Sequence, residues 1–403
     1  MSSTESPRAY EMVNPATQRL HYLDNLRALA MIGGVFFHAA LAYSPVLHNL
    51  WLTADSNQSV VVDIVSWFSH LFRMPVFFVI AGFFVAYLVG KRGMGGMLAN
   101  RAKRILLPFI IFLPLCLWAI VASLMSAVAT VENKSPMLLM IAQAIATPGS
   151  PPPPFSTMHL WFLYNLMFFC ILTWALGYLN WTRLFNLFNS IKPLYFMLLF
   201  PLLLLPALMS VSSPFPAPDQ LLPQLWSFGF FGLFFALGYW IFRSEQFIEK
   251  FQPFGWVLLV ASILAYALYH YSIPKQISYP PVPNEFPLNL LLKSCEAYIS
   301  VWMTLACLVF GKRYLNTHNS VMRFFSDSSY WIYIIHLPLL FAVQYQLLDQ
   351  NWGLLAKYTA SVGITLAIGA VTYIAFVRWT PIGWMLNGRK KVVNKTEALP
   401  AAE

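Results

Sequence analysis

The stretch Arg27-Ala-Leu-Ala-Met-Ile-Gly-Gly-Val-Phe-Phe-His38 decides the fold of this chain, because it places an arginine and a histidine eleven positions apart in an apolar run. At about 100° and about 1.5 Å per residue, eleven steps make about three helical turns, so both side chains share one face with about 16 Å of rise between them. If this helix crosses a bilayer, Arg27 lies at one water interface and His38 near the middle. An ionisable side chain at that depth indicates a functional site that faces a polar interior.

The composition of the whole chain indicates an integral membrane protein. Of its 403 residues, 59% are hydrophobic and only 10% are charged, whereas soluble domains carry about 25% charged residues. The net charge of +10 does not predict a nucleic-acid partner, because the basic residues lie in short loops between apolar runs and not on one exposed face. The four cysteines form neither a C-x-x-C pair nor a cluster with metal-ligand spacing, so we expect no metal.

Runs of about 20 apolar residues predict about ten transmembrane helices, and hence an all-α, polytopic membrane protein. The runs are centred near residues 26–46, 60–89, 105–128, 159–179, 193–211, 224–242, 254–271, 288–310, 327–347 and 354–377. Almost all basic loop residues fall on one side of these runs, and the opposite loops contain only Lys134 and Lys275. Both termini are therefore predicted to be cytoplasmic. We divide the chain into a cytoplasmic tail (1–20), one membrane domain (21–386) and a second cytoplasmic tail (387–403).

The second run carries a row of polar side chains. They are Asp63, Ser66, His70 and Arg73, spaced by three, four and three. This spacing aligns them along one face of a helix. Because an arginine inside a membrane is costly to bury, we interpret Arg73 as pointing into a wet or anion-binding cavity. The alternative is that Arg73 pairs with a carboxylate from another helix.

Two arginines, Arg101 and Arg104, lie three residues apart where the third run begins, and so share a helix face. Guanidinium groups in such a pair suit bidentate binding of phosphate or pyrophosphate. Spacing alone favours an ordinary cytoplasmic anchor of positive charge over such a binding site.

Polar side chains recur in the eighth and ninth runs. Lys293 and Glu296 are three residues apart, which predicts a structural ion pair along one helix. Tyr333 and His336 share a helix face, with His336 near the middle of the membrane. Two separate helices therefore each bring a histidine to a similar depth. His159, at the external end of the fourth run, either lines an outer entrance or lies at the membrane interface.

In their order and spacing, these motifs resemble those of the membrane acyltransferase-3 family. The resemblance rests on Arg27 and His38 with ten residues between them, the run 77–83, Arg101-x-x-Arg104 before Pro108, His159-Leu-Trp-Phe-Leu163, and Ser329-Tyr330-x-x-Tyr333-x-x-His336. It extends from about His21 to about Arg378. Within the family, the chain is most similar to the glucan biosynthesis protein C group.

The resemblance implies a multi-pass enzyme of the bacterial inner membrane, surrounded by lipid. Such enzymes move an acyl group, commonly acetyl or succinyl, from a cytoplasmic donor such as acetyl-CoA or succinyl-CoA to a hydroxyl of a glycan or other envelope molecule. For this chain the resemblance implies His38 as the catalytic histidine and Arg27 as its positional partner. It also implies that Arg101 and Arg104 bind the acyl-CoA.

The residue chemistry agrees with acyl transfer. The reaction needs a base to activate a hydroxyl or a group that accepts the acyl, and a neutral imidazole serves either role. Arg73 is the candidate to stabilise the developing oxyanion. The side chains expected to contact substrate are His70, His159, Tyr333 and His336.

Two other classes of protein remain open from the sequence. A secondary transporter or flippase for an anionic or lipid-linked solute would also use buried histidines and an arginine. Broken-helix signals in corresponding positions of two halves would favour that class, and the sequence shows none. A non-catalytic membrane scaffold would leave the buried polar residues without a purpose.

Overall fold

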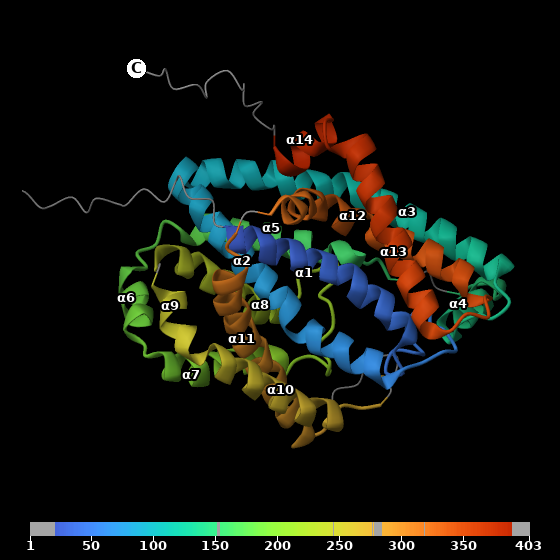
Figure 1. Cartoon of the computed structure of the whole chain (residues 1–403), viewed down its shortest axis with the longest axis horizontal. Helices are drawn as coiled ribbons and strands as arrows, with labels where there is room; N and C mark the ends of the chain where they lie inside the picture. Colours follow the sequence, from blue (N-terminus) through green and yellow to red (C-terminus); the bar gives the residue numbers. More distant parts are fainter. Residues whose placement is uncertain are drawn as a thin grey trace, which may run out of the picture.

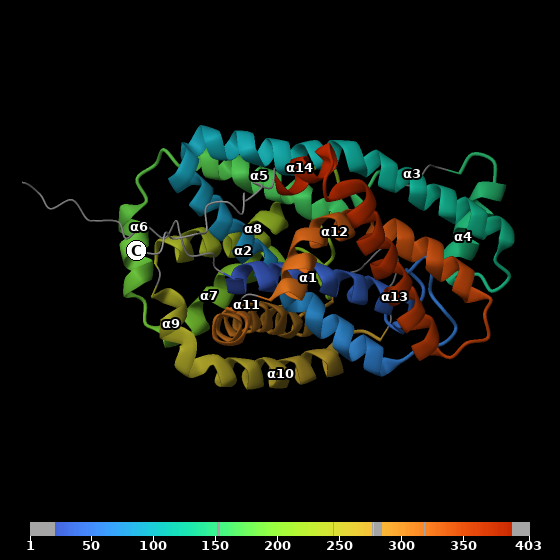
Figure 2. The same ribbon diagram turned by 45° about the horizontal axis from the view of Figure 1, so that its top comes forward.

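The computed structural model describes residues 21–150, 154–244, 246–275, 277, 284–317 and 319–388. In this part of the chain every named element is a helix or helical turn, and the strand-like pairing is a single bridge between Ser156 and Gln220. The helices pack side by side into one elongated bundle (Figures 1 and 2). The all-α class predicted from the sequence is confirmed.

Every predicted apolar run coincides with a helix. These helices are α1 (His21–Ala40), α2 (Val60–Arg101), α3 (Leu107–Thr130), α5 (Trp161–Leu176), α7 (Pro193–Leu208), α8 (Leu225–Arg243), α10 (Gly255–Ser272), α11 (Leu288–Tyr314), α12 (Ser320–Leu348) and α13 (Leu354–Thr372). Shorter elements lie between them: α4 (Pro136–Ala146), α6 (Thr182–Ser190), α9 (Phe247–Phe251), α14 (Pro381–Asn387), the 3₁₀ turns η1 (Leu41–Tyr43), η3 (Met158–Leu160) and η4 (Gln252–Phe254), and the π-helical turns η2 (Ala102–Leu106) and η5 (Tyr373–Val377).

Eight helical stretches of the described chain are long and apolar enough to cross a membrane. One of them, Val60–Thr130, contains two of the predicted runs. The chain turns back within it at Gly93, whose φ of 71° favours glycine, so that α2 and α3 run in opposite directions (Figure 1). The apolar helix α7 has only 16 residues. The number of ten crossings and the cytoplasmic placement of both termini stay predictions.

The first helix ends earlier than its apolar run. Ser44 has an extended backbone with ψ of 118°. The cause is Pro45, because a proline disfavours helical geometry in the residue before it. After α1 ends at Ala40, the η1 turn continues the run to Tyr43. His38 therefore lies in the last turn of α1, where a loop can reach it, and not in the middle of a longer helix.

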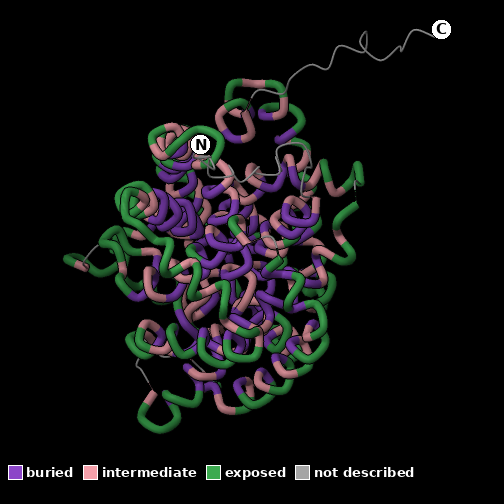
Figure 3. The backbone as a smooth tube through the Cα atoms, turned by 90° about the vertical axis from the view of Figure 1, so that its left-hand side faces the viewer, coloured by how far each residue is buried: buried purple, intermediate pink, exposed green. Residues whose placement is uncertain are grey.

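Glycines allow the tightest helix crossing, between α2 and α8. A methyl group on Gly82 would lie 1.9 Å from the Phe235 carbonyl oxygen, and one on Gly238 would lie 1.8 Å from the Val79 carbonyl oxygen. Such close backbone approach through small residues is typical of helix pairs in membranes. Buried segments gather at the centre of the bundle and exposed ones around it (Figure 3). The exposed residues include large apolar side chains such as Trp118, 72% exposed, which suit contact with lipid.

Candidate functional site

Three histidines from three separate parts of the chain meet in the interior. They are His38 in α1, His159 in η3 and His336 in α12. The ring centroids of His38 and His336 are 5.2 Å apart, and those of His159 and His336 are 5.0 Å apart. Tyr333 joins them, since its hydroxyl donates a hydrogen bond of 2.6 Å to the carbonyl oxygen of His159. We call His38, His159 and His336 the histidine cluster.

Each imidazole of the histidine cluster has a buried nitrogen that finds no hydrogen-bond partner in the described part of the protein. These atoms are Nδ1 of His38, Nδ1 of His159 and Nε2 of His336. The other nitrogen of His336 is 2.6 Å from the Tyr333 carbonyl oxygen, and that of His159 is 2.8 Å from the Ile334 carbonyl oxygen. A carbonyl oxygen only accepts, so these nitrogens carry the proton and the unpartnered ones present lone pairs. An unpartnered buried acceptor costs about 1–3 kcal/mol, so the cluster favours any ligand that supplies hydroxyl donors.

Arg73 from α2 lies beside the histidine cluster. A methyl group on Gly34 would come within 2.8 Å of its Nη1, and its Cζ is 4.9 Å from the ring centroid of Phe37. Gly34 precedes His38 by one helical turn, so the guanidinium lies on the face of α1 that bears His38. Among the described residues Arg73 forms no ion pair with a carboxylate, and its Nε is buried without a partner. The alternative of a structural ion pair is therefore not seen among the described residues, and anion binding by Arg73 stays a prediction.

Two aromatic contacts extend the site. Phe37 stacks on His70 with ring centroids 5.4 Å apart and also contacts His38, so it lies against both histidines. On the other side, Trp51 stacks on His38 at 6.0 Å with an interplanar angle of 24°. The sequence analysis missed Trp51, because it lies in the irregular connection between η1 and α2, where no helical spacing predicts the direction of a side chain.

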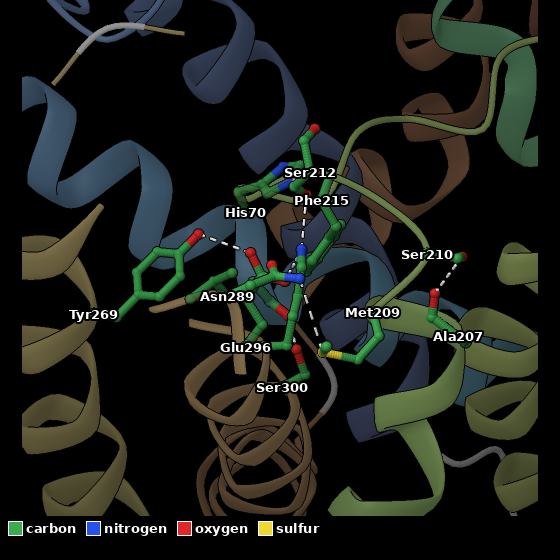
Figure 4. A network of polar contacts seen from close by, with 12 residues as sticks. His70, Ala207, Met209, Ser210, Ser212, Phe215, Tyr269, Asn289, Glu296 and Ser300 are labelled. Carbon is green, nitrogen blue, oxygen red and sulfur yellow. Dashed lines mark hydrogen bonds and ion pairs between the residues drawn. The ribbon is translucent and has the colours of Figure 1, made fainter. Parts of the chain in front are cut away.

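A second polar cluster fixes the segment of chain to which His70 is hydrogen-bonded (Figure 4). Lys293 and Glu296 form the predicted ion pair at 2.9 Å, with both side chains fully buried. Lys293 also donates to the Ser212 carbonyl oxygen at 2.7 Å, and Tyr269 donates to Glu296 at 2.9 Å. The connection between α7 and α8 is thereby held in place, and His70 Nε2 donates to the carbonyl oxygen of Phe215 in it at 2.9 Å.

Arg27 does not reach His38 in this structure. Its Nη2 lies 3.4 Å from Asp24 and 3.2 Å from the hydroxyl of Ser326 in α12. Its Cζ is 5.7 Å from the ring centroid of Phe84. The helix places the two residues on one face, as the sequence predicted, but about 16 Å of rise separates them. Arg27 therefore belongs to the opposite end of α1 from the histidine cluster.

Arg101 and Arg104 lie at the same end as Arg27. Arg101 is close enough to both for electrostatic interaction, and its Nε is buried without a partner. Arg104 lies within the π-helical turn η2, a geometry that often marks functional sites. The Tyr330 hydroxyl donates to the Arg104 carbonyl oxygen at 2.7 Å. Three guanidinium groups thus gather at one end of the site, an arrangement that suits a ligand with several phosphates.

Comparison with known proteins agrees with this arrangement. Residues 20–374 match the model of a family described as an acyltransferase domain, the acyltransferase-3 family. The chain is 25% identical over 418 aligned positions to Glucans biosynthesis protein C of Escherichia coli strain SMS-3-5 and to that of strain K12, with 96% of this chain and 100% of each relative covered. No solved structure matches the chain. The family match covers most of the chain and its motif residues, and we conclude that this protein is a multi-pass membrane acyltransferase that belongs to the acyltransferase-3 family.

Proposed function

We propose that this protein moves an acyl group, acetyl or succinyl, from cytoplasmic acyl-CoA to a hydroxyl of a glycan in the bacterial envelope, and that it works in the inner membrane. The observation that carries the proposal is the histidine cluster, in which buried nitrogens lie beside Arg73, and among the described residues the nitrogens have no hydrogen-bond partner and the arginine has no carboxylate. A bundle that only needed stability would pair or replace such groups. Their arrangement suits a reaction that moves a proton and develops negative charge.

In the proposed reaction His38 acts as the base. Its neutral imidazole takes the proton of the acceptor hydroxyl while the hydroxyl oxygen attacks the thioester carbonyl. Arg73 stabilises the oxyanion that forms on that carbonyl. When the carbon–sulfur bond breaks, the imidazolium returns the proton to the departing thiolate, so the ester and free CoA are the products. A covalent acyl-imidazole on His38, with the hydroxyl attacking in a second step, uses the same groups.

The three arginines at the far end of α1 are the proposed site for the donor. Arg27, Arg101 and Arg104 would hold the phosphates of CoA, whose long pantetheine arm would then extend along α1 toward His38. Arg27 and His38 are separated by about 16 Å along the helix, so only a long donor can bind the arginines and reach His38 at the same time. We assign Arg27 to donor binding, because its contacts lie with Ser326 and Asp24 and not with the histidine cluster.

The acceptor is proposed from two observations. The relatives with full coverage are named for glucan biosynthesis, which points to a glucan or similar glycan. The free lone pairs on His159 and His336 suit the hydroxyl groups of a sugar, and Tyr333 and His70 hold the surrounding backbone. A transporter or flippase stays the alternative hypothesis, and membership of an acyltransferase family favours transfer over it.

A label-transfer assay tests the proposal. Purified protein in liposomes receives acetyl-CoA or succinyl-CoA labelled in the acyl group, together with a glucan acceptor, and label on the glucan is measured. We expect His38→Ala to lower transfer by about 10²–10⁴-fold, the usual contribution of a general base. His270→Ala is the matched control, because His270 in α10 lies outside the histidine cluster. Equal turnover of His38→Ala and the control would overturn the role of His38, and transport of unreacted glucan by the parent protein would favour the transporter.

A further inference from the structure

A pocket of about 600 Å³ lies away from the histidine cluster, between α5, α6, α7 and α8. Its size falls in the range of about 300–1,000 Å³ that is typical of ligand sites. Apolar side chains make up most of its lining, among them Phe169 and Leu172 of α5, Phe200 of α7 and Phe228 of α8. No histidine of the cluster lines it. The proposed transfer reaction therefore gives this pocket no role.

The amphipathic helix α6 covers the pocket. Its apolar residues Leu184, Phe185 and Phe188 share one face, and all three line the pocket. Leu184 is exposed, and Phe185 and Phe188 are only half-buried. These two rings contact the edge of the bundle, with the ring centroid of Phe188 5.5 Å from that of Trp240, and the pocket lies beside them. In Figures 1 and 2, α6 lies at the edge of the molecule. An apolar helix face above an apolar pocket is favourable only when apolar material, such as an acyl chain, fills the space between them.

A cation lies where the pocket meets the surface. Arg243, the last residue of α8, lines the pocket and is exposed. Its Cζ is 4.9 Å from the ring centroid of Phe185 and 5.3 Å from that of Tyr239, and its Nη2 is 3.4 Å from the Tyr239 hydroxyl. Among the described residues it forms no ion pair with a carboxylate. These contacts hold the guanidinium over the apolar pocket.

Taken together, these features match a ligand with an acyl chain and a negative head. We propose that the pocket binds one anionic phospholipid, with an acyl chain beneath α6 and the phosphate against Arg243. A second positive charge lies nearby, because Lys250 donates to the carbonyl oxygen of Asn189 in α6 at 3.1 Å. A zwitterionic lipid would fill the same space but would gain less from these two charges. Lipid binding here is independent of the proposed transfer reaction.

Native mass spectrometry of the full chain tests the proposal. The purified protein is stripped of lipid, exchanged into mixed micelles with phosphatidylglycerol or phosphatidylcholine, and the lipid retained per chain is counted. We expect one phosphatidylglycerol to be retained. Ala236→Phe should abolish retention, because Ala236 lines the pocket and is exposed, so the new ring fills the space without disturbing the core. Ala122→Phe, on the exposed face of α3, is the control.

The charge of the head is tested separately. Arg243→Gln should weaken binding of phosphatidylglycerol about fivefold and leave that of phosphatidylcholine unchanged, as expected for one cation at an anionic lipid surface. Arg313→Gln is the matched control, because Arg313 also lies in the last turn of a helix and its Cζ is 5.3 Å from an aromatic ring centroid, that of Tyr314. If Ala236→Phe retains as much lipid as Ala122→Phe does, the pocket is not the lipid-binding site. Equal loss of both lipids in Arg243→Gln, or displacement of the lipid by inorganic phosphate alone, would overturn the assignment of an anionic phospholipid.

Discussion

Two groups of polar side chains lie inside the same helical bundle, and they differ in whether their buried polar atoms have hydrogen-bond partners. In one group, Lys293, Glu296 and Tyr269 satisfy one another, and Lys293 uses a further donor on the Ser212 carbonyl oxygen. In the other, each imidazole of the histidine cluster keeps a buried nitrogen that has no partner within the described ranges. Both groups are costly to bury, but only the first recovers that cost through its own contacts.

The difference separates structural polar residues from functional ones more clearly than depth in the membrane does. The sequence places Glu296 and His336 in similar apolar runs, and burial alone does not distinguish them, since they are 0% and 2% exposed. Their hydrogen-bond partners distinguish the two residues. The group of Lys293 should therefore govern stability and the histidine cluster should govern turnover, and the following experiments test that division.

The largest effect is expected at Lys293. Changing Lys293 to Met leaves Glu296 buried without its cation, which should lower the free energy of unfolding by about 3–5 kcal/mol. Unfolding by denaturant in detergent micelles measures this loss. The double change Lys293→Met and Glu296→Leu should recover much of it, because no charge is then left unpaired. If His38→Ala destabilises the protein as much as Lys293→Met does, the contrast between the two groups is wrong.

A smaller effect, on turnover alone, is expected at Arg73. Arg73→Gln should lower kcat by about 10²–10³-fold, the usual loss when a donor to a developing oxyanion is removed. Its free energy of unfolding should not fall, because Arg73 pairs with no carboxylate in the described part of the chain. Steady-state kinetics and unfolding of the same preparation give both values. A destabilised variant with normal kcat would place Arg73 with the structural group.

The smallest effect is expected at Asp349, a satisfied carboxylate outside the membrane-spanning segments. Backbone N–H groups of Asn133 and Glu132 donate to it and hold the pKa of its carboxyl below the usual value. A depressed pKa stabilises the fold above the unfolded value of about 3.9 and loses that contribution as pH falls through the folded pKa. Parent protein should therefore have a higher Tm than Asp349→Asn at pH 7, and the difference should vanish in acid. A difference that does not change with pH would contradict this explanation.

Much of the scaffold follows from local sequence. Each apolar run is a helix in the structure, because a run of that length can satisfy its backbone in lipid only as a helix. The pairing of Lys293 with Glu296 was also predictable, since residues three apart on a helix are neighbours. So was the shared face of Arg27 and His38. The sequence missed α6, because nine residues with a mixed composition fall below the length of a membrane span.

By itself, then, the sequence determined the helices, their apolar faces and the motifs that resemble the acyltransferase-3 family, because these depend on residues close together in the chain. Only the tertiary structure decided which polar groups meet. His38, His159 and His336 lie on three elements that are far apart in sequence, and helix packing brings the rings of His38 and His159 to 5.2 and 5.0 Å from that of His336. Packing also left Arg73 without a carboxylate partner among the described residues, and it formed the pocket beside α6. Contacts of this kind depend on how whole helices cross, and that is set by side-chain packing along their full length.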